Sequence, residues 1–182
     1  MMKFESDFSL FYHFSGSDMI KNNLKDSIQT QKSSRQIRKI HMKEGKEYHG
    51  QVDDSGLPDG YGLYFGESNY MYLGEFISGI RTGRGTTVDK DKNKYVGDFV
   101  NDYRHGNGTM IWLSGDKYDG NWENGFRTGY GIYSWPNGAK YDGYWANGNR
   151  DGNGTEIFSN GDEYQGQWKD NKQNGYGIYQ WS

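Results

Sequence analysis

Tyrosine recurs at a fixed interval of 23 residues along most of this 182-residue chain. The recurring residues are Tyr72, Tyr95, Tyr118, Tyr141 and Tyr164, and an earlier copy that begins at Tyr48 is one residue longer. A fixed period of about 20 to 50 residues indicates a repeat architecture, in which each unit is one supersecondary element that packs on its neighbours. The period therefore predicts a fold made by stacking copies of one small unit.

Each copy opens with the pattern Tyr-x-Gly-x-aromatic, which is YLGEF at 72, YVGDF at 95, YDGNW at 118, YDGYW at 141 and YQGQW at 164. The copy at 48 reads YHGQV, with Val52 in the aromatic position. A Gly-x-Gly pair follows in every copy, and a second short run of apolar and polar residues follows the pair. Alternation places the tyrosine, the glycine and the aromatic residue on one face of a strand. Each unit is therefore predicted to be a β-hairpin.

Glycine has two predicted roles in the unit. In mid-strand it weakens a sheet, so its recurrence there indicates space for an aromatic ring from the next strand to lie over the bare backbone. At the turn, seven residues after the tyrosine, glycine alternates with Asp and Asn, the other residues that tolerate a left-handed backbone. These turn residues are Gly79, Asp102, Gly125, Gly148 and Asn171.

The composition excludes a thick globular core, because only 32% of residues are hydrophobic and the mean hydropathy is −1.07. Aromatic residues nevertheless make up 17% of the chain, and 28 residues are glycine, which is not typical of disorder. We predict an all-β fold, an elongated single-layer antiparallel meander of about six β-hairpins over residues 37–182. A capping strand at 37–45 precedes repeats that start at 48, 72, 95, 118, 141 and 164, and the sheet is expected to be roughly 55–60 Å long.

Residues 1–36 have no counterpart in the repeat and are predicted to form a partly helical or extended anchoring arm. Its aromatic residues Phe8, Phe11, Tyr12 and Phe14 are expected to dock, either on the chain's own sheet or on another subunit. A short amphipathic helix is expected over residues 17–28. The basic residues Lys32, Arg35, Arg38 and Lys39 would face an acidic neighbour; a disordered tail is the alternative.

Chemical catalysis is not expected, because the four histidines share no repeat position and the Gly-x-Gly pairs open strands rather than helices. We expect no enzyme activity, cofactor, metal site or nucleic-acid partner. The chain has no cysteine, no apolar run long enough to span a bilayer and no signal peptide pattern at residues 1–14, so a cytoplasmic location is expected. Residues 1–47 hold nine basic against six acidic residues, and residues 48–182 hold twelve against eighteen.

The pattern Tyr-x-Gly-x-Trp-x-x-Gly-x-x-x-Gly-x-Gly at a 23-residue period resembles the MORN (membrane occupation and recognition nexus) repeat over residues 48–182. The resemblance implies a meandering sheet of successive hairpins with a grooved face. MORN proteins often serve in cytoskeletal assemblies, including the radial spokes of the ciliary axoneme. The resemblance therefore implies a structural or adaptor protein in a multi-protein complex, associated with the cytoskeleton or cilium.

The aromatic residues of the repeats are first of all the packing of such a sheet. A single layer cannot cover both of its faces, so some of these rings are expected to stay accessible and to form a groove for a helix or an extended segment of a partner protein. The expected protein-binding residues are Trp112, Tyr118, Trp122, Tyr133, Trp135, Tyr141, Trp145, Tyr164 and Trp168.

Two other functions stay open at this level. The resemblance extends to membrane-associated MORN proteins, and the basic arm could bind anionic phospholipid at about 1 kcal/mol per basic residue near the surface. MORN arrays also precede kinase and methyltransferase domains, so the chain could be the regulatory region of a truncated enzyme. Because Trp181 falls within the second strand of the sixth hairpin, we expect either a partner at that edge or further chain beyond it.

Overall fold

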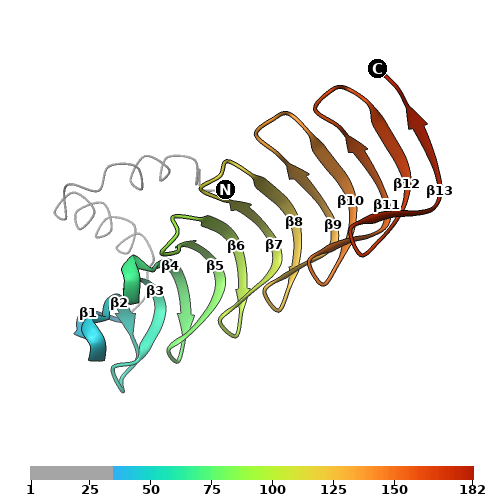
Figure 1. The fold of residues 1–182 in the computed structure, drawn as a ribbon. Helices are drawn as coiled ribbons and strands as arrows, with labels where there is room; N and C mark the ends of the chain where they lie inside the picture. The colour runs from blue at the N-terminus through green and yellow to red at the C-terminus, as the bar shows by residue number, and fades with distance from the viewer. Residues whose placement is uncertain (1–34) are drawn as a thin grey trace.

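Residues 35–182 are described by the structure, a computed structural model. They form one antiparallel sheet of thirteen strands that follow one another in sequence order (Figure 1). The strands are β1 (Gln36–His41), β2 (Glu47–Val52), β3 (Pro58–Phe65), β4 (Met71–Ile77), β5 (Ile80–Val88), β6 (Lys94–Val100), β7 (Tyr103–Ile111), β8 (Lys117–Glu123), β9 (Phe126–Ser134), β10 (Lys140–Ala146), β11 (Asn149–Ile157), β12 (Glu163–Lys169) and β13 (Lys172–Gln180). The predicted all-β meander is confirmed. Residues 1–34 of the predicted arm 1–36 lie outside the described residues, and Gln36 is the first residue of β1.

Strands β2 to β13 make six hairpins, one per repeat, and β1 pairs with β2 at the beginning of the array. The capping strand is shorter than the expected range 37–45, because it ends at His41 and residues Lys43–Gly45 form a short 3-10 turn. Glu44 and Gly45 there have φ angles of 61° and 72°, which an extended strand does not allow. The backbone N–H of Met42 donates to the Lys46 carbonyl at 2.8 Å and closes this turn.

The hairpin turns have the left-handed backbone that the sequence predicts. The residue seven positions after the tyrosine has φ of 82° at Gly79, 68° at Asp102 and 67° at Asn171. The residue before it is also left-handed, with φ of 48° at Ser78 and 49° at Asn101. Two consecutive residues with positive φ define the type I′ turn, whose twist matches that of the flanking strands.

The mid-strand glycines face each other across each hairpin, as Gly120 and Gly131 do between β8 and β9. A Cβ atom added to Gly120 would lie 2.5 Å from the Gly131 Cα atom and 2.8 Å from the Tyr118 hydroxyl oxygen. For Gly131 the covering ring comes from the neighbouring strand, as expected, whereas Gly120 is covered by the tyrosine of its own strand. Only glycine leaves room for the ring at both positions.

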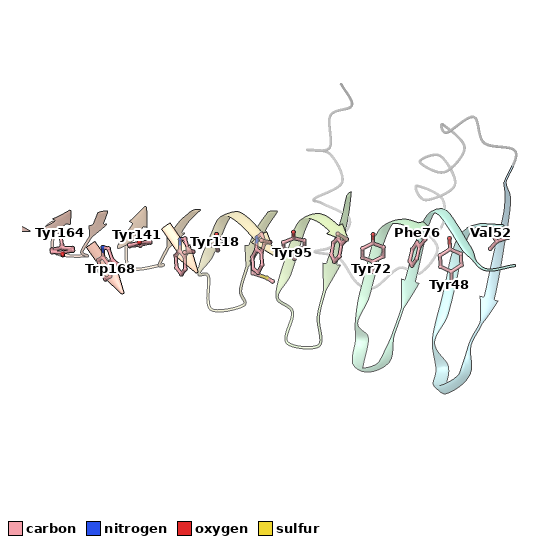
Figure 2. Close-up of a cluster of buried hydrophobic side chains, with 13 residues drawn as sticks. Tyr48, Val52, Tyr72, Phe76, Tyr95, Tyr118, Tyr141, Tyr164 and Trp168 are labelled. Carbon is pink, nitrogen blue, oxygen red and sulfur yellow. The ribbon is translucent and has the colours of Figure 1, made fainter. Parts of the chain in front are cut away.

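The core is a single file of aromatic rings along one face of the sheet, shown in Figure 2. We call the six recurring tyrosines, Tyr48, Tyr72, Tyr95, Tyr118, Tyr141 and Tyr164, the tyrosine ladder, and the face that carries them the aromatic face. Tyr118 is fully buried and meets Trp122 of its own repeat and Trp145 of the next repeat edge-on, at centroid distances of 5.2 and 5.3 Å. Edge-to-face contacts of this kind stabilise an aromatic pair by more than the burial of its apolar area alone. Each ring thus joins two consecutive hairpins.

The glycine pair generates a test of this packing. We expect Gly120→Ala to lower the free energy of unfolding by about 1–3 kcal/mol, because the added methyl group overlaps backbone atoms that cannot move aside. Thermal unfolding followed by circular dichroism measures the loss. The control is Gly138→Asn in the turn after β9, where φ is 88° and no atom lies within 4 Å of an added Cβ. Only the left-handed backbone opposes this change, and Asn tolerates that backbone, so the loss should stay below about 1 kcal/mol. Equal losses in the two variants would contradict the steric account.

A second test follows from the ionisation of the tyrosine ladder. Burial raises the pKa of Tyr141 to about 12, and it raises the pKa values of Tyr48, Tyr72, Tyr95 and Tyr118 further above the ordinary value near 10. The unfolded chain then loses these protons at a lower pH than the folded chain, so the contribution of these tyrosines to stability is constant below about pH 10 and falls as the pH rises toward 12. The melting temperature measured between pH 9 and 12 should fall steeply above pH 10. An unchanged melting temperature up to pH 12 would show that the rings are not held neutral by burial.

Candidate protein-binding face

Six of the nine expected binding residues lie in the core rather than on an accessible surface. Tyr118, Trp122, Tyr141, Trp145, Tyr164 and Trp168 have between 0% and 7% of their surface exposed. The rings cover one another edge-on from repeat to repeat, and the tryptophan N–H groups are also satisfied, since Trp122 donates to the Gly108 carbonyl at 2.9 Å and Trp145 to the Gly131 carbonyl at 3.0 Å. A partner cannot contact these side chains while the sheet is folded. They can affect binding only by supporting the residues that lie over them.

The other three expected residues, Trp112, Tyr133 and Trp135, lie together on the aromatic face and are half-buried. Tyr133 is in β9, and its ring centroid lies 5.4 Å from that of Trp112 and 4.7 Å from that of Trp135. The two tryptophans follow β7 and β9 in the sequence and therefore mark the end of the strands remote from the hairpin turns. We call these three residues the tryptophan cluster.

A row of arginines that the sequence analysis missed completes this face. Arg81, Arg104, Arg127 and Arg150 recur at the same 23-residue interval as the tyrosines, and this spacing was the signal that could have revealed them. Each guanidinium lies over a ring of the next repeat: Arg104 is 4.6 Å from the Trp122 centroid, Arg127 is 4.3 Å from Trp145 and Arg150 is 4.2 Å from Trp168. The same groups donate to turn carbonyls of the next repeat, at 3.1 Å from Arg104 to Gly125 and 2.7 Å from Arg127 to Gly148.

The four arginines differ in their charge partners. Arg81 forms an ion pair with Asp102 at 2.8 Å, and Arg150 forms one with Glu156 at 2.9 Å. Arg104 and Arg127, in the middle of the row, have no ion pair with a carboxylate of residues 35–182.

Carboxylates nevertheless lie in the surroundings of these two arginines. Asp89 is near enough to Arg104 to act on its charge, and Asp116 lies beside Tyr133. Burial lowers the pKa values of Arg104 and Arg127 below the ordinary value, although both groups stay charged at neutral pH. The middle of the face therefore carries two partly desolvated cations without a direct carboxylate partner.

Arg127 is part of the arginine row and also contacts the tryptophan cluster. Its guanidinium carbon lies 5.3 Å from the Tyr133 ring centroid and 6.0 Å from that of Trp112, in addition to Trp145 beneath it. A guanidinium among aromatic rings is stabilised by cation–π attraction, and its remaining N–H groups can still donate to a carboxylate. Trp, Tyr and Arg are also the residue types enriched at the energetic centres of protein interfaces. The arrangement suits an apolar side chain beside an acidic one.

The basic residues assigned to the arm divide between two regions. Lys32 and the aromatic residues Phe8, Phe11, Tyr12 and Phe14 lie outside the described residues. Arg35 pairs with Asp59 of β3 at 2.5 Å, and Lys39 pairs with Glu47 of β2 at 3.2 Å. Arg38 donates to the Gln36 side chain of its own strand at 2.6 and 3.1 Å. The acidic neighbours of Arg35 and Lys39 are thus on the first strands of the same sheet.

The face opposite to the tyrosine ladder carries two shallow hollows over β5 to β9. Their linings mix polar and apolar side chains and include Asn107, Lys117 and Asp119. Residues 35–182 contain no group of three or more His, Cys, Asp or Glu side chains placed to hold a metal ion. In the same part of the chain, no helix has the length and apolar character needed to span a membrane.

Comparisons with known proteins identify the repeat. The model of the MORN repeat matches five consecutive segments, residues 72–94, 95–117, 118–140, 141–163 and 164–182. Comparison with curated proteins gave no match.

Among solved structures, the sheet is similar to the TCP domain of Drosophila melanogaster SAS-4 (dCPAP), which was solved with a proline-rich motif of Ana2 (dSTIL). That match has 13% identity, covers 72% of this chain and 64% of that chain, and has a TM-score of 0.41. The TCP10 domain of Danio rerio CPAP matches with 14% identity over 76% of this chain and 85% of its own, at a TM-score of 0.38.

Proposed function

Because the chain belongs to the MORN repeat family, whose model matches residues 72–182, we propose that it is a non-enzymatic adaptor that binds a partner protein on its aromatic face. The binding centre is the tryptophan cluster together with Arg104 and Arg127. The observation that carries this proposal is Arg127, a half-buried cation that is surrounded by rings and has no ion-paired carboxylate in the described part of the chain. The partner is a protein segment that places a carboxylate beside an apolar side chain.

A carboxylate of the partner is stabilised at this centre because the Arg127 guanidinium is already partly desolvated. Arg127 has already lost part of its hydration in the folded sheet, so a carboxylate that reaches it gains a charge-assisted hydrogen bond without the full desolvation cost of the cation. The rest of the repeat region is acidic, with twelve basic against eighteen acidic residues from 48 to 182. An acidic segment is therefore repelled by most of this surface and attracted to the arginines, which favours one binding position.

The repeat spacing limits how such a segment can lie. Consecutive arginines of the row are two strands apart, which is about 10 Å in a sheet with strands about 4.8 Å apart. Carboxylates three residues apart in an extended polyproline II segment, or seven residues apart in a helix, lie on one side of the segment at about this separation. A partner with two acidic residues at either spacing can meet Arg104 and Arg127 at once, with its apolar side chains over the tryptophan cluster.

We extend the proposal to the cellular setting that the family resemblance implies, a cytoskeletal assembly such as the radial spoke of a ciliary axoneme. A long sheet that exposes the same kind of face in every repeat can hold several parts of such an assembly in register. Its support is the repeat family and the length of the sheet.

The partner chemistry is testable with a library of random peptides displayed on phage and selected on the full chain. We expect the enriched peptides to combine Asp or Glu with a large apolar residue. A fluorescent peptide with the consensus sequence should lose at least tenfold in affinity on Arg127→Gln and on Trp135→Ala, because each change removes one half of the binding centre. Fluorescence anisotropy measures the dissociation constants.

Matched controls come from the same repeat positions. Arg150→Gln removes an arginine that already pairs with Glu156, and Trp181→Ala removes a tryptophan position two repeats away from Trp135. Both should change the affinity less than threefold, and circular dichroism should show that all four variants stay folded. Enriched peptides without carboxylates, or equal effects of the control and test variants, would contradict the proposed centre.

The assembly setting has its own test, crosslinking mass spectrometry of the chain purified under native conditions from its own cells. Reproducible crosslinks from the repeat lysines Lys117, Lys140 and Lys169 to cytoskeletal or axonemal proteins are expected. Crosslinks mainly to membrane proteins, with these lysines silent, would contradict a cytoskeletal adaptor and favour membrane attachment.

A further inference from the structure

The tips of the first four hairpins carry a row of exposed apolar side chains. Leu57, Ile80, Tyr103 and Phe126 have 49%, 43%, 57% and 58% of their surface exposed, and we call them the hairpin-tip row. The last three are the first residues of β5, β7 and β9. Leu57 is their equivalent in the longer first repeat, because the next residue, Pro58, accepts a hydrogen bond from Gly79 just as Arg81 does from Asp102.

The hairpin-tip position is apolar in the first four hairpins and polar in the last two. In the last two hairpins the same position is occupied by Asn149 and Lys172. Across the turn, Ile77 pairs with Ile80 and Val100 pairs with Tyr103, with 60% and 44% of their own surface exposed. The apolar surface is therefore limited to the N-terminal part of the sheet, whereas a general need of the fold would place it in all six hairpins.

This surface is separate from the proposed partner-binding centre. The neighbouring pair, Phe76 and Arg81, lies on the aromatic face, so alternation puts Ile77 and Ile80 on the opposite face. The tryptophan cluster lies at the other ends of the strands. The hairpin-tip row can therefore bind a ligand independently of the proposed partner-binding centre.

The N-terminal segment enters the sheet beside the beginning of this row. Gln36, the first residue of β1, is opposite Val52 at the tip end of β2. Arg35 pairs with Asp59, and the other oxygen of the Asp59 carboxylate accepts the backbone N–H of Ser78 in the turn between Ile77 and Ile80. The chain before residue 35 therefore starts within one hairpin of the apolar surface.

We propose that residues 8–14 of this chain pack on the hairpin-tip row. The segment reads FSLFYHF and holds five large apolar residues in seven. Twenty residues separate it from Arg35, and when extended they reach up to about 70 Å, whereas the row spans only about 29 Å over six strand spacings. Seven extended residues are about 23 Å long, so the segment can cover most of the row.

Burial of apolar surface on both sides drives this contact. Exposed apolar patches that run over several neighbouring side chains mark interaction sites. A segment tethered at the adjacent edge has an effective concentration far above that of a separate molecule, so it occupies the row even when the intrinsic affinity is modest. Residues 8–14 are an apolar segment of this chain that is tethered to the sheet beside the row.

The test places the photoreactive amino acid p-benzoylphenylalanine at position 11 of the full chain. After irradiation, peptide mapping should find crosslinks within the same molecule to residues 77–80, 100–103 and 126. Their yield should be independent of protein concentration. The double variant Ile80→Ser/Tyr103→Ser should lower this yield at least fivefold. The matched double variant Asn149→Ser/Lys172→Ser, at the same repeat positions in the polar hairpins, should leave it unchanged.

Three outcomes would overturn the proposal. Crosslinked dimers whose yield rises with concentration would show that the segment binds a second copy. Crosslinks to the tryptophan cluster would place it on the aromatic face. The absence of any crosslink, with the photoreactive residue shown to be incorporated, would show that the row is not covered by this segment.

Discussion

The tyrosine ring that lies over a pair of cross-strand glycines is the contact on which the whole sheet depends. A single-layer sheet has no second layer to bury its apolar side chains, so the ring must be covered by its own backbone and by its neighbours in the row. The Gly120–Gly131 pair lets the Tyr118 ring approach the backbone, and its hydroxyl group donates to the Asn121 carbonyl at 3.0 Å. Trp122 and Trp145 then pack against the Tyr118 ring on two sides. Tyr72, Tyr95 and Tyr141 also have a ring on both sides, whereas the first repeat has Val52 in one ring position and Tyr164 contacts only the Trp168 ring among residues 35–182. These contacts replace a globular core.

Since the glycines and tyrosines hold each hairpin, the other positions of the repeat can vary without loss of the fold. The position of Trp112 and Trp135 holds Asp89 in the second repeat and Phe158 in the fifth. The arginine position keeps its residue in four repeats. Asp102 pairs with the arginine at one end of the row and Glu156 with the one at the other end, whereas Arg104 and Arg127 have no ion pair with a carboxylate of residues 35–182. Under the proposed function, these differences between repeats are the source of specific binding, because the tyrosine ladder beneath them is uniform.

The sequence alone predicted the features that depend on one residue at one repeated position. The strand pairs, the left-handed turns and the space over the glycines follow from Tyr, Gly and Asp or Asn at fixed spacing, and all three are confirmed. The sequence predicted that the repeat aromatics pack the sheet, but not which of them stay accessible, because alternation tells which face a ring is on and does not tell whether the next repeat covers it. Trp122, Trp145 and Trp168 are buried by the tyrosines of two repeats and by arginines 18 residues away in sequence.

The position of the arginine row could not be predicted from the sequence for a different reason. Its 23-residue spacing is visible in the sequence, but an arginine in a polar strand is ordinarily read as a solvated charge. Its position over a ring depends on the register between one repeat and the next, as does its ion pairing. Arg81 and Arg127 both lie over rings, but Arg81 also pairs with Asp102, which is 21 residues away, and no local sequence pattern reveals this difference. The charge that distinguishes the binding face thus emerges only when the hairpins are stacked.

Thermal unfolding of a chain that lacks residues 118–140 tests the central claim most directly. If each repeat is held only by the ring and glycine contacts with its neighbours, removal of one whole period brings Tyr95 against Trp145 in place of Trp122. The shortened chain should then keep a β-sheet circular dichroism spectrum and a cooperative transition at a slightly lower temperature. A chain that fails to fold would show that the repeats are not interchangeable and that contacts beyond the tyrosine ladder hold the sheet together.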